Sequence, residues 1–358
     1  AMADVSPGVD ATEEAFDLAA DGDEPGAARA FDRATAHFDD ARGKISGFWT
    51  LPARLVPVVG QHVQAVQVVA SEGVGLSDTA ADTARTVDPE EIRFTEGRLD
   101  LDAIEDLTPA LDRAERALGR AEERITEART PWLLEPVEHR LTELITELAD
   151  ARPAARTAAL AAREVPAMLG GAGPVDWLVA VTTPAEARGL GGLVGNWVLA
   201  RAHDGEITIV DSGRNEDVNE RLRAVDAELR GPQQYLDRWG RFSPEVFFQD
   251  VTLSPDLPMA AAVMADLFDQ AMGTSIDGVV VLDPFAVAAI LDLTGPVQTS
   301  QIRLGADSVV PFLLEEQYRL DEADRVLVLE ELIEGSFERL TGGELPGPAG
   351  IAATLAPV

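Results

Sequence analysis

The chain contains no cysteine, which excludes disulfide bonds, thiolate metal sites and cysteine nucleophiles. Histidine is scarce: His37, His62, His139 and His203 are scattered and lack the H-E-x-x-H spacing of a zinc site. No G-x-S-x-G motif is present, so a serine hydrolase built on that motif has no support. Any active site must therefore rely on other side chains.

Long apolar runs are also missing, since none approaches the roughly 20 residues of a membrane-spanning helix. The best candidate, Gly278 to Leu291, is interrupted by Asp283 and Pro284. The opening residues AMADV lack the basic, apolar and cleavage-site regions of a signal peptide. We expect the chain as given to be soluble and to carry no signal peptide.

Positive charge is sparse, because 29 basic residues stand against 63 acidic ones and the formal net charge is −34 at pH 7. The acidic residues are spread over both halves of the chain. Such a surface repels nucleic acid and anionic lipid headgroups. We expect no nucleic-acid partner and interpret the acidic surface as a solubility feature.

The first half has the pattern of amphipathic helices. Apolar residues recur at steps of three and four over residues 104–128 and again over 134–151, with further apolar stripes over 28–38 and from Pro57 onward. Thr108 before Pro109 and Thr130 before Pro131 have the form of capped helix starts. Short connections between such helices predict an antiparallel bundle over residues 1–169, acting as a spacer or docking domain.

The pattern changes at GGAGP, residues 170–174, which is a predicted domain boundary. Short segments rich in β-branched residues predict strands over 176–181, 196–202, 206–212 and 277–283, and HDGE at 203–206 fits a hairpin turn. Helices are predicted over 258–272, 284–291 and 322–340. The chain is thus a predicted α+β two-domain protein, a helical bundle followed by an α/β domain over 174–358.

The segment TTPAEARGLGGLVG, residues 182–195, gathers four glycines beside Glu186 and Arg188. A dinucleotide fingerprint would need a glycine where Val194 stands, and no Gly-Lys-Ser/Thr follows to make a Walker A loop. Exposed amide groups beside an arginine suit an anion such as phosphate. A tight turn in which Glu186 pairs with Arg188 is the structural alternative, and both interpretations stay open.

Carboxylates are the other candidates for chemistry. Asp250 and Asp256 lie in FFQDVTLSPDLP, while Asp277 and Asp283 stand at the two ends of a predicted strand. Carboxylates at strand ends suit a divalent cation that bridges to phosphate. Helix capping suits them equally, since Asp256 and Asp283 precede prolines at predicted helix starts, and for Asp283 we favour capping.

Three segments together resemble one family: LVAVTTPAEARGLGGLVGNWVLARAHDGEITI, FQDVTLSPDLP and SIDGVVVLDPFAVAAILDLTGPV. With the upstream LPARLVPVVGQHVQAV, they resemble the bacterial envelope family known as domain of unknown function four-zero-one-two, over residues 50–345. The family pattern Asn-Asn-x-Glu-x-Arg-x-x-Gly-Gly falls here on Thr182, Thr183, Glu186, Arg188, Gly191 and Gly192, with threonines in place of both asparagines.

This resemblance implies an extracytoplasmic protein that is anchored in the membrane by an N-terminal helix in its full-length form. A more distant similarity, in IDGVVVLDPFAVAAILDLTGPV, connects the chain to the LytR-CpsA-Psr phosphotransferases. Those proteins move glycopolymers from polyprenyl-pyrophosphate carriers onto peptidoglycan with arginines, an aspartate and magnesium. The similarity implies a mixed sheet with helices on its faces, and it puts Arg325 at a late arginine motif.

The resemblance gives each candidate residue a role. The expected catalytic residues are Arg188, Glu186 and Arg325. The expected substrate-binding residues, all in or beside the glycine-rich segment, are Thr183, Gly191, Gly192 and Asn196. Asp250 and Asp256 are the expected ligands of a Mg²⁺ cofactor.

The expected partner is a polyprenyl-pyrophosphate-linked glycopolymer or another cell-wall polymer, and a second copy of the chain is a further candidate. Whether the α/β domain transfers the polymer or only binds it stays open. The alternative is a non-catalytic envelope scaffold with a degenerate phosphotransferase-like domain, and a purely structural spacer is the third interpretation.

Overall fold

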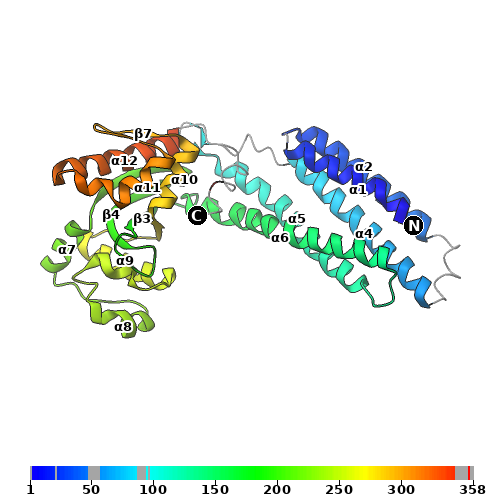
Figure 1. Cartoon of the computed structure of the whole chain (residues 1–358), viewed down its shortest axis with the longest axis horizontal. Coiled ribbons are helices and arrows are strands. Elements are labelled where there is room, and N and C mark those ends of the chain that lie inside the picture. Colours follow the sequence, from blue (N-terminus) through cyan, green and yellow to red (C-terminus); the bar gives the residue numbers. More distant parts are fainter. Residues whose placement is uncertain are drawn as a thin grey trace. The chain divides into compact units, whose positions relative to one another are not determined.

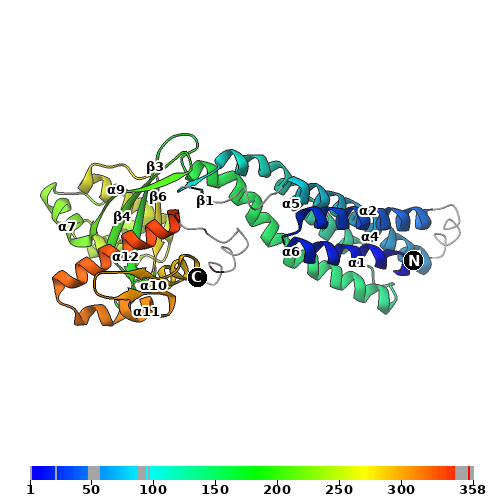
Figure 2. The ribbon, with the colours of Figure 1, turned by 90° about the horizontal axis from the view of Figure 1, so that it is seen from above.

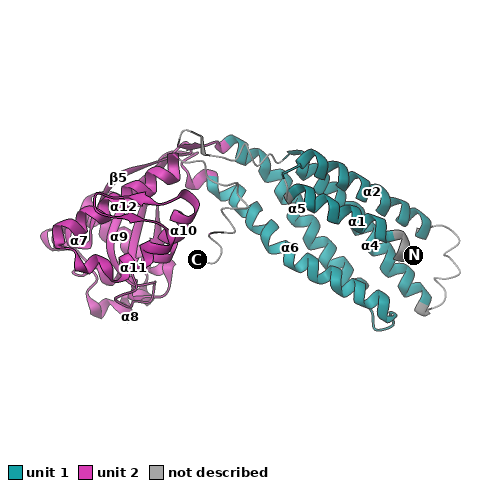
Figure 3. Cartoon of the chain, turned by 45° about the horizontal axis from the view of Figure 1, so that its top comes forward, with its two compact units in different colours: residues 1–91, 102–165 teal, residues 92–101, 166–358 magenta. Residues whose placement is uncertain are grey.

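The computed structural model describes residues 2–20, 22–46, 57–86, 94–95, 97–342 and 354. The chain divides into two compact units, residues 1–91 with 102–165 and residues 92–101 with 166–358. Helices make up the first unit, and the second contains a mixed sheet with helices, so the predicted α+β two-domain fold is confirmed (Figures 1 and 3).

The first unit contains five helices among its described residues: α1 (Met2–Ala20), α2 (Glu24–Ser46), α4 (Pro57–Thr86), α5 (Leu101–Ala128) and α6 (Glu135–Met168). One apolar cluster draws buried side chains from all five. Phe38 of α2 shows how closely they pack, because a Cβ atom on Gly8 or Gly73 would lie only 2.8 Å from its ring. Glycine at these two positions lets α1 and α4 approach the phenyl ring.

Two predicted helix starts in this unit are wrong. α5 begins at Leu101, so Pro109 lies inside the helix, where it supplies no hydrogen-bond donor. Buried apolar residues ahead of the proline extend the packed face and outweigh this loss. α6 begins only at Glu135: Thr130 donates its hydroxyl to Gln61 at 3.0 Å instead of capping a helix, and the chain turns at residues 131 and 132.

Over the described residues, the second unit is built on a six-stranded sheet with the order β1-β2-β5-β4-β3-β6. Its strands are β1 (Phe94–Thr95), β2 (Arg98–Leu99), β3 (Val175–Thr183), β4 (Leu193–His203), β5 (Glu206–Arg214) and β6 (Gly278–Leu282). All neighbours are antiparallel except β3 and β6, which run parallel. The four predicted strands are confirmed, whereas β1 and β2 were not predicted.

β4 and β5 are joined by the predicted hairpin turn, with Asp204 at φ 50° and Gly205 at φ 78°. Both turn residues donate their N–H groups to backbone carbonyls, Asp204 to Gly170 at 3.2 Å and Gly205 to Leu169 at 3.0 Å. The carbonyl of Gly205 in turn accepts from Leu99 at 3.0 Å. This turn therefore ties three chain segments together.

Helices cover both faces of the sheet (Figures 1 and 2). On one face lie α7 (Asn215–Ala224), α8 (Gln233–Trp239) and α9 (Leu257–Met272), which share an apolar cluster with β3 and β4. Trp197 of β4 and Phe268 of α9 meet edge to face there, with ring centroids 5.1 Å apart. The prediction of a helix over 258–272 is confirmed, but α7 and α8 were missed.

On the other side are α10 (Pro284–Thr294), α11 (Ala306–Leu314) and α12 (Glu322–Gly342), with a small ribbon of β7 (Val297–Gln298) and β8 (Arg303–Leu304). They form their own apolar cluster around Leu291, Phe312 and Val328. The predicted helices over 284–291 and 322–340 are confirmed, and α11 was missed. None of the helices that the structure describes is both long and apolar enough to cross a lipid bilayer.

Candidate functional site

The connection between β3 and β4, residues 184–192, is named the glycine loop here. It lies where the parallel strands β3 and β6 both end. Thr182 donates its hydroxyl to the Leu282 carbonyl at 3.3 Å, and a Cβ atom on Gly191 would be 3.8 Å from Asp283. In open sheets, ligands bind outside the carboxyl ends of parallel strands. The glycine loop occupies that position.

At three positions of the loop, steric constraints explain why the residue is glycine. A Cβ atom on Gly189 would lie 2.6 Å from the Leu253 carbonyl oxygen, and one on Gly192 would lie 2.0 Å from the Thr183 carbonyl oxygen. Gly191 and Gly192 also have φ of +72° and +128°, a region that residues with side chains rarely adopt. The glycines therefore allow close backbone packing and two left-handed conformations.

A short 3-10 helix, η3 (Phe248–Leu253), forms the floor of the loop. The Leu190 N–H donates to the Thr252 carbonyl at 3.0 Å, and the Thr252 hydroxyl donates to the Gly192 carbonyl at 2.7 Å. Because Thr252 is fully buried, these bonds are shielded from water. The loop is thus fastened from below at two points.

Tyr235 of α8 supports this floor from the core. It is fully buried, and its hydroxyl donates to the Val251 carbonyl at 3.0 Å. Burial raises the pKa of this phenol, and the negative charges of Asp250 and Glu245 raise the pKa further. The hydroxyl therefore keeps its proton, and with it the hydrogen bond, at neutral pH.

Arg188 is held by Asp250, a pairing that the sequence analysis did not foresee. Its Nε and Nη2 atoms are both 2.8 Å from Asp250 Oδ1, and Nη1 donates to the Ala187 carbonyl at 3.0 Å. Glu186, the partner of Arg188 in the tight-turn alternative, lies farther away, with Oε2 3.9 Å from Nη2. Three of the five guanidinium N–H groups are thus engaged, which leaves two for a ligand.

Most backbone N–H groups of the glycine loop are unused. Those of Glu186 and Leu190 donate to backbone carbonyls. The others have no acceptor among the residues that the structure describes; they belong to Ala185, Ala187, Arg188, Gly189, Gly191 and Gly192. Residues 185–187, 189 and 191 are exposed, so a ligand can reach this part of the backbone.

The other predicted substrate-binding and catalytic residues lie at separate places in the second unit. Thr183 ends β3 beside the loop, and its hydroxyl is buried without a hydrogen-bond partner. Asn196 lies within β4, paired with Val181 of β3, and no described hydrogen bond connects its side chain to the loop. Arg325 lies on α12 with its guanidinium 5.7 Å from the Tyr318 ring centroid, and nothing in the described part of the chain bonds it to the loop.

The expected Mg²⁺ ligands have other contacts. Asp250 pairs with Arg188, and Asp256 caps α9 by accepting from the Met259 N–H at 3.0 Å. Across the described ranges, no three His, Asp or Glu side chains gather as a metal-binding group. Asp283 caps α10, as favoured, accepting from the N–H groups of residues 285 and 286. These carboxylates do not fit a Mg²⁺ site, and the proposed function requires no Mg²⁺.

A cleft of about 820 Å³ lies next to the glycine loop, between α8, the 3-10 turn η2 (Gly240–Phe242) and the start of α9. We name it the α8 cleft; its lining residues are Gln234, Asp237, Arg238, Trp239, Arg241, Ser254, Pro255, Asp256 and Met259. The loop and the cleft share a wall, since a Cβ atom on Gly189 would lie 2.7 Å from the Pro255 nitrogen. Sequence reasoning missed this cleft, although QYLDRWGRF alternates arginines with aromatic residues.

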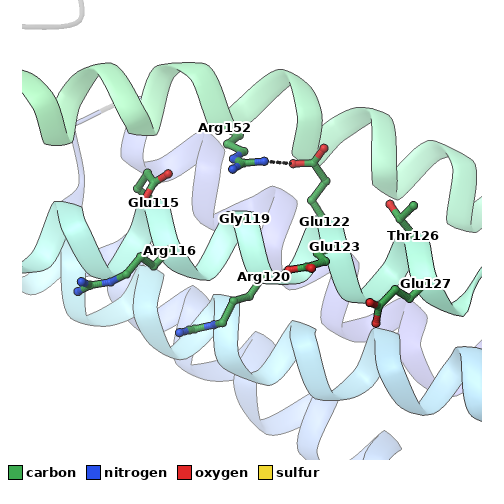
Figure 4. A pocket seen from close by; sticks show the side chains of 9 residues that line it. All are labelled: Glu115, Arg116, Gly119, Arg120, Glu122, Glu123, Thr126, Glu127 and Arg152. Atoms are coloured by element: carbon green, nitrogen blue, oxygen red, sulfur yellow. Dashed lines mark hydrogen bonds and ion pairs between the residues drawn. The ribbon is translucent and has the colours of Figure 1, made fainter.

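A second cleft belongs to the first unit (Figure 4). It lies on the charged surface of α5, where Arg116 and Arg120 are surrounded by glutamates and Arg152 of α6 pairs with Glu122 at 2.9 Å. Apart from Gly119 and Thr126, only charged side chains line it. It has the features of a solvated helix surface.

Residues 172–318 match the family model described as "Protein of unknown function (DUF4012)". The matched segment begins just ahead of β3 and includes the glycine loop, η3 and the α8 cleft. It supports the family resemblance carried by the three sequence segments. No curated protein and no solved structure matches the chain.

Proposed function

We propose that the second unit binds the phosphate groups of a polyprenyl-pyrophosphate-linked glycopolymer in the bacterial cell envelope, and that the glycine loop is the phosphate site. The observation that carries the proposal is the set of unused N–H groups beside Arg188. Phosphate oxygens accept several hydrogen bonds at once, and a run of backbone N–H groups in a glycine-rich turn is a common way to supply them.

The geometry makes Arg188 a positioned donor. Asp250 holds its guanidinium from one side, so the two remaining N–H groups need little ordering when an anion arrives. Each hydrogen bond to a charged group contributes roughly 1.5–3 kcal/mol. Binding therefore depends on the backbone as much as on the arginine. The polymer and the envelope location rest on the family resemblance.

Calorimetric titration with inorganic pyrophosphate tests the proposal. We expect binding to the wild type and a loss of about tenfold or more in affinity for Arg188→Gln, equivalent to about 1.4 kcal/mol. Arg221→Gln on α7 is the matched control, because Arg221 is exposed and has no ion pair among the described residues. Its affinity should stay within about twofold of wild type.

Amide NMR locates the binding site without relying on the heat of binding that calorimetry measures. Pyrophosphate should shift the signals of residues 185–192 and leave those of Asp204 and Gly205 unchanged. Folded protein that shows neither heat nor shifts would overturn the proposal and favour the non-catalytic scaffold. Equal weakening by Arg221→Gln would show that only the overall charge matters.

A further inference from the structure

The α8 cleft contains two arginines without acidic partners. Arg238 and Arg241 make no ion pair with any described residue, and unlike the similarly unpaired Arg221 and Arg223 of α7 they line one cleft together. In a chain with a net charge of −34, two unpaired cations in one cleft favour an anion from outside.

The carboxylates of the same cleft already have hydrogen-bond partners. Asp237 accepts from Gln233 Nε2 at 2.7 Å, and Asp256 accepts from the Met259 N–H at 3.0 Å. Their charges reduce the positive potential of the cleft but do not occupy the guanidinium groups. The arginines therefore keep their donors free for a ligand.

Aromatic rings lie beside Arg241 at one end of the cleft. The Arg241 guanidinium carbon lies 4.8 Å from the Phe242 ring centroid, and the Phe242 and Trp239 ring centroids are 6.2 Å apart. Trp239 itself lines the cleft and is partly exposed. Trp239 and the exposed Gln234 thus supply an apolar ring and an amide to the same cleft.

These features define the chemistry of the ligand. A pyranose ring has an apolar face of C–H groups that packs on an aromatic ring, and hydroxyls that bond to an amide side chain such as that of Gln234. A negative group on the sugar would meet the two arginines. We propose that the α8 cleft binds a sugar that carries a phosphate or carboxylate group.

This inference rests on the proposed function and extends it. Since the glycine loop and the α8 cleft share the wall at Ser254 and Pro255, a ligand with pyrophosphate at the loop has its first sugars beside the cleft. The α8 cleft would then select among polymers by their charge, whereas the loop recognises the carrier phosphate.

Saturation-transfer NMR on the full chain tests the inference with three probes: glucose-1-phosphate, glucuronate and glucose. We expect saturation of the ring protons of both anionic sugars, and at least tenfold weaker binding of glucose. Arg238→Gln/Arg241→Gln should weaken the anionic sugars by about tenfold or more. Trp239→Ala should reduce saturation of the ring protons.

Arg221→Gln/Arg223→Gln is the matched control, because it removes the same charge from exposed positions on α7 that have no described ion pair. It should leave sugar binding unchanged. Equal binding of glucose, or equal losses in the two double variants, would overturn the inference. So would competition by inorganic phosphate without any saturation of sugar ring protons, which would show a plain anion site.

Pyrophosphate titrations separate the two proposals. Arg238→Gln/Arg241→Gln should retain pyrophosphate binding at the loop, and Arg188→Gln should retain binding of glucuronate in the α8 cleft. Pyrophosphate binding without sugar binding would overturn only the proposal that the α8 cleft binds an anionic sugar. Sugar binding without pyrophosphate binding would overturn only the proposal that the glycine loop binds phosphate.

Discussion

The two connections that lead into and out of β4 differ in almost every respect. Asp204 and Gly205 join β4 to β5 with two residues, and both of their N–H groups are bonded to backbone carbonyls. The glycine loop joins β3 to β4 with residues 184–192, and most of its N–H groups have no described acceptor. Both connections link antiparallel neighbours in one sheet.

This difference supports the glycine loop, and not the hairpin turn, as the connection with the proposed binding role. Two residues are enough for a hairpin, so the longer loop is not required by the topology. The glycine loop nevertheless has a specific floor in η3 and a specific ion pair in Arg188 and Asp250. A loop that is fastened by its neighbours while its own N–H groups stay unused is what the proposed phosphate site requires.

The largest effect is expected for Gly192→Ala. A Cβ atom there would lie 2.0 Å from the Thr183 carbonyl oxygen, so the backbone must move. We expect a loss of about 3 kcal/mol or more in the free energy of unfolding, measured by urea denaturation. Gly205→Ala should cost a similar amount, since its Cβ would lie 2.1 Å from the Leu99 carbonyl oxygen.

Pyrophosphate binding by the two variants then distinguishes the role of the glycine loop from that of the hairpin turn. Gly205→Ala protein that is still folded should bind pyrophosphate normally, and Gly192→Ala protein should not. Gly195→Ala is the control, with its nearest contact at 3.9 Å, and should cost under about 1 kcal/mol. Wild-type stability of Gly192→Ala would show that the loop does not pack as described.

A smaller effect is expected from breaking the ion pair under the loop. Arg188 and Asp250 are 20% and 22% exposed, so Asp250→Asn should lower the free energy of unfolding by about 1–2 kcal/mol, below the cost for a fully buried pair. A double-mutant cycle with Arg188→Gln measures the coupling energy. The exposed Arg230–Glu228 pair is the comparison and should give under about 0.5 kcal/mol.

Alkaline pH should loosen the floor of the glycine loop. Folding raises the pKa of Tyr235, so its stabilising contribution is complete below the unfolded value of about 10 and is lost as the pH rises above it. The slope is at most about 1.4 kcal/mol per pH unit. Urea denaturation at increasing pH should show this slope in the wild type and in Tyr318→Phe. A slope that persists unchanged in Tyr235→Phe would assign it to another group.

The smallest effect is expected for Gly191→Ala. Its φ of +72° strains a side chain, but the nearest atom to the new Cβ would be 3.5 Å away, so the cost should be about 1 kcal/mol. Asn tolerates this conformation better, and Gly191→Asn should recover part of the loss in thermal unfolding. A comparison of the two variants would show whether the backbone conformation alone explains the presence of glycine at position 191.

Local patterns were sufficient to predict the strands and longer helices of the second unit. β3, β5 and β6 are rich in β-branched residues, and α9 and α10 begin with Asp-x-Pro or Asp-Pro caps. The shorter helices α7, α8 and α11 have weaker signals. β1 and β2 span two residues each, too few for a pattern, and they are strands only because β5 pairs with β2.

For the site, the sequence identified the residue types but could not identify the contacts. Glu186 was the partner of Arg188 in the tight-turn alternative, yet Asp250 is the closer partner across 62 positions. Such a pairing is decided by how η3 packs under the loop, which no local pattern encodes. The α8 cleft was missed for the same reason, because it forms only where α8, η2 and α9 converge.

The hairpin turn at Asp204 and Gly205 has a further consequence for how the molecule can be rebuilt. Leu99 and Gly170 both bond to this turn, so the whole stretch from α5 through α6 leaves the sheet and returns to it at one place. In engineering terms, α5 and α6 are an insertion with adjacent ends. A short linker from residue 100 to residue 169 would remove them and keep β2 on the edge of β5, at the cost of the apolar side chains that α5 and α6 supply to the cluster of the first unit. Conversely, a deletion up to residue 170 would discard the edge strands of the sheet along with the helices.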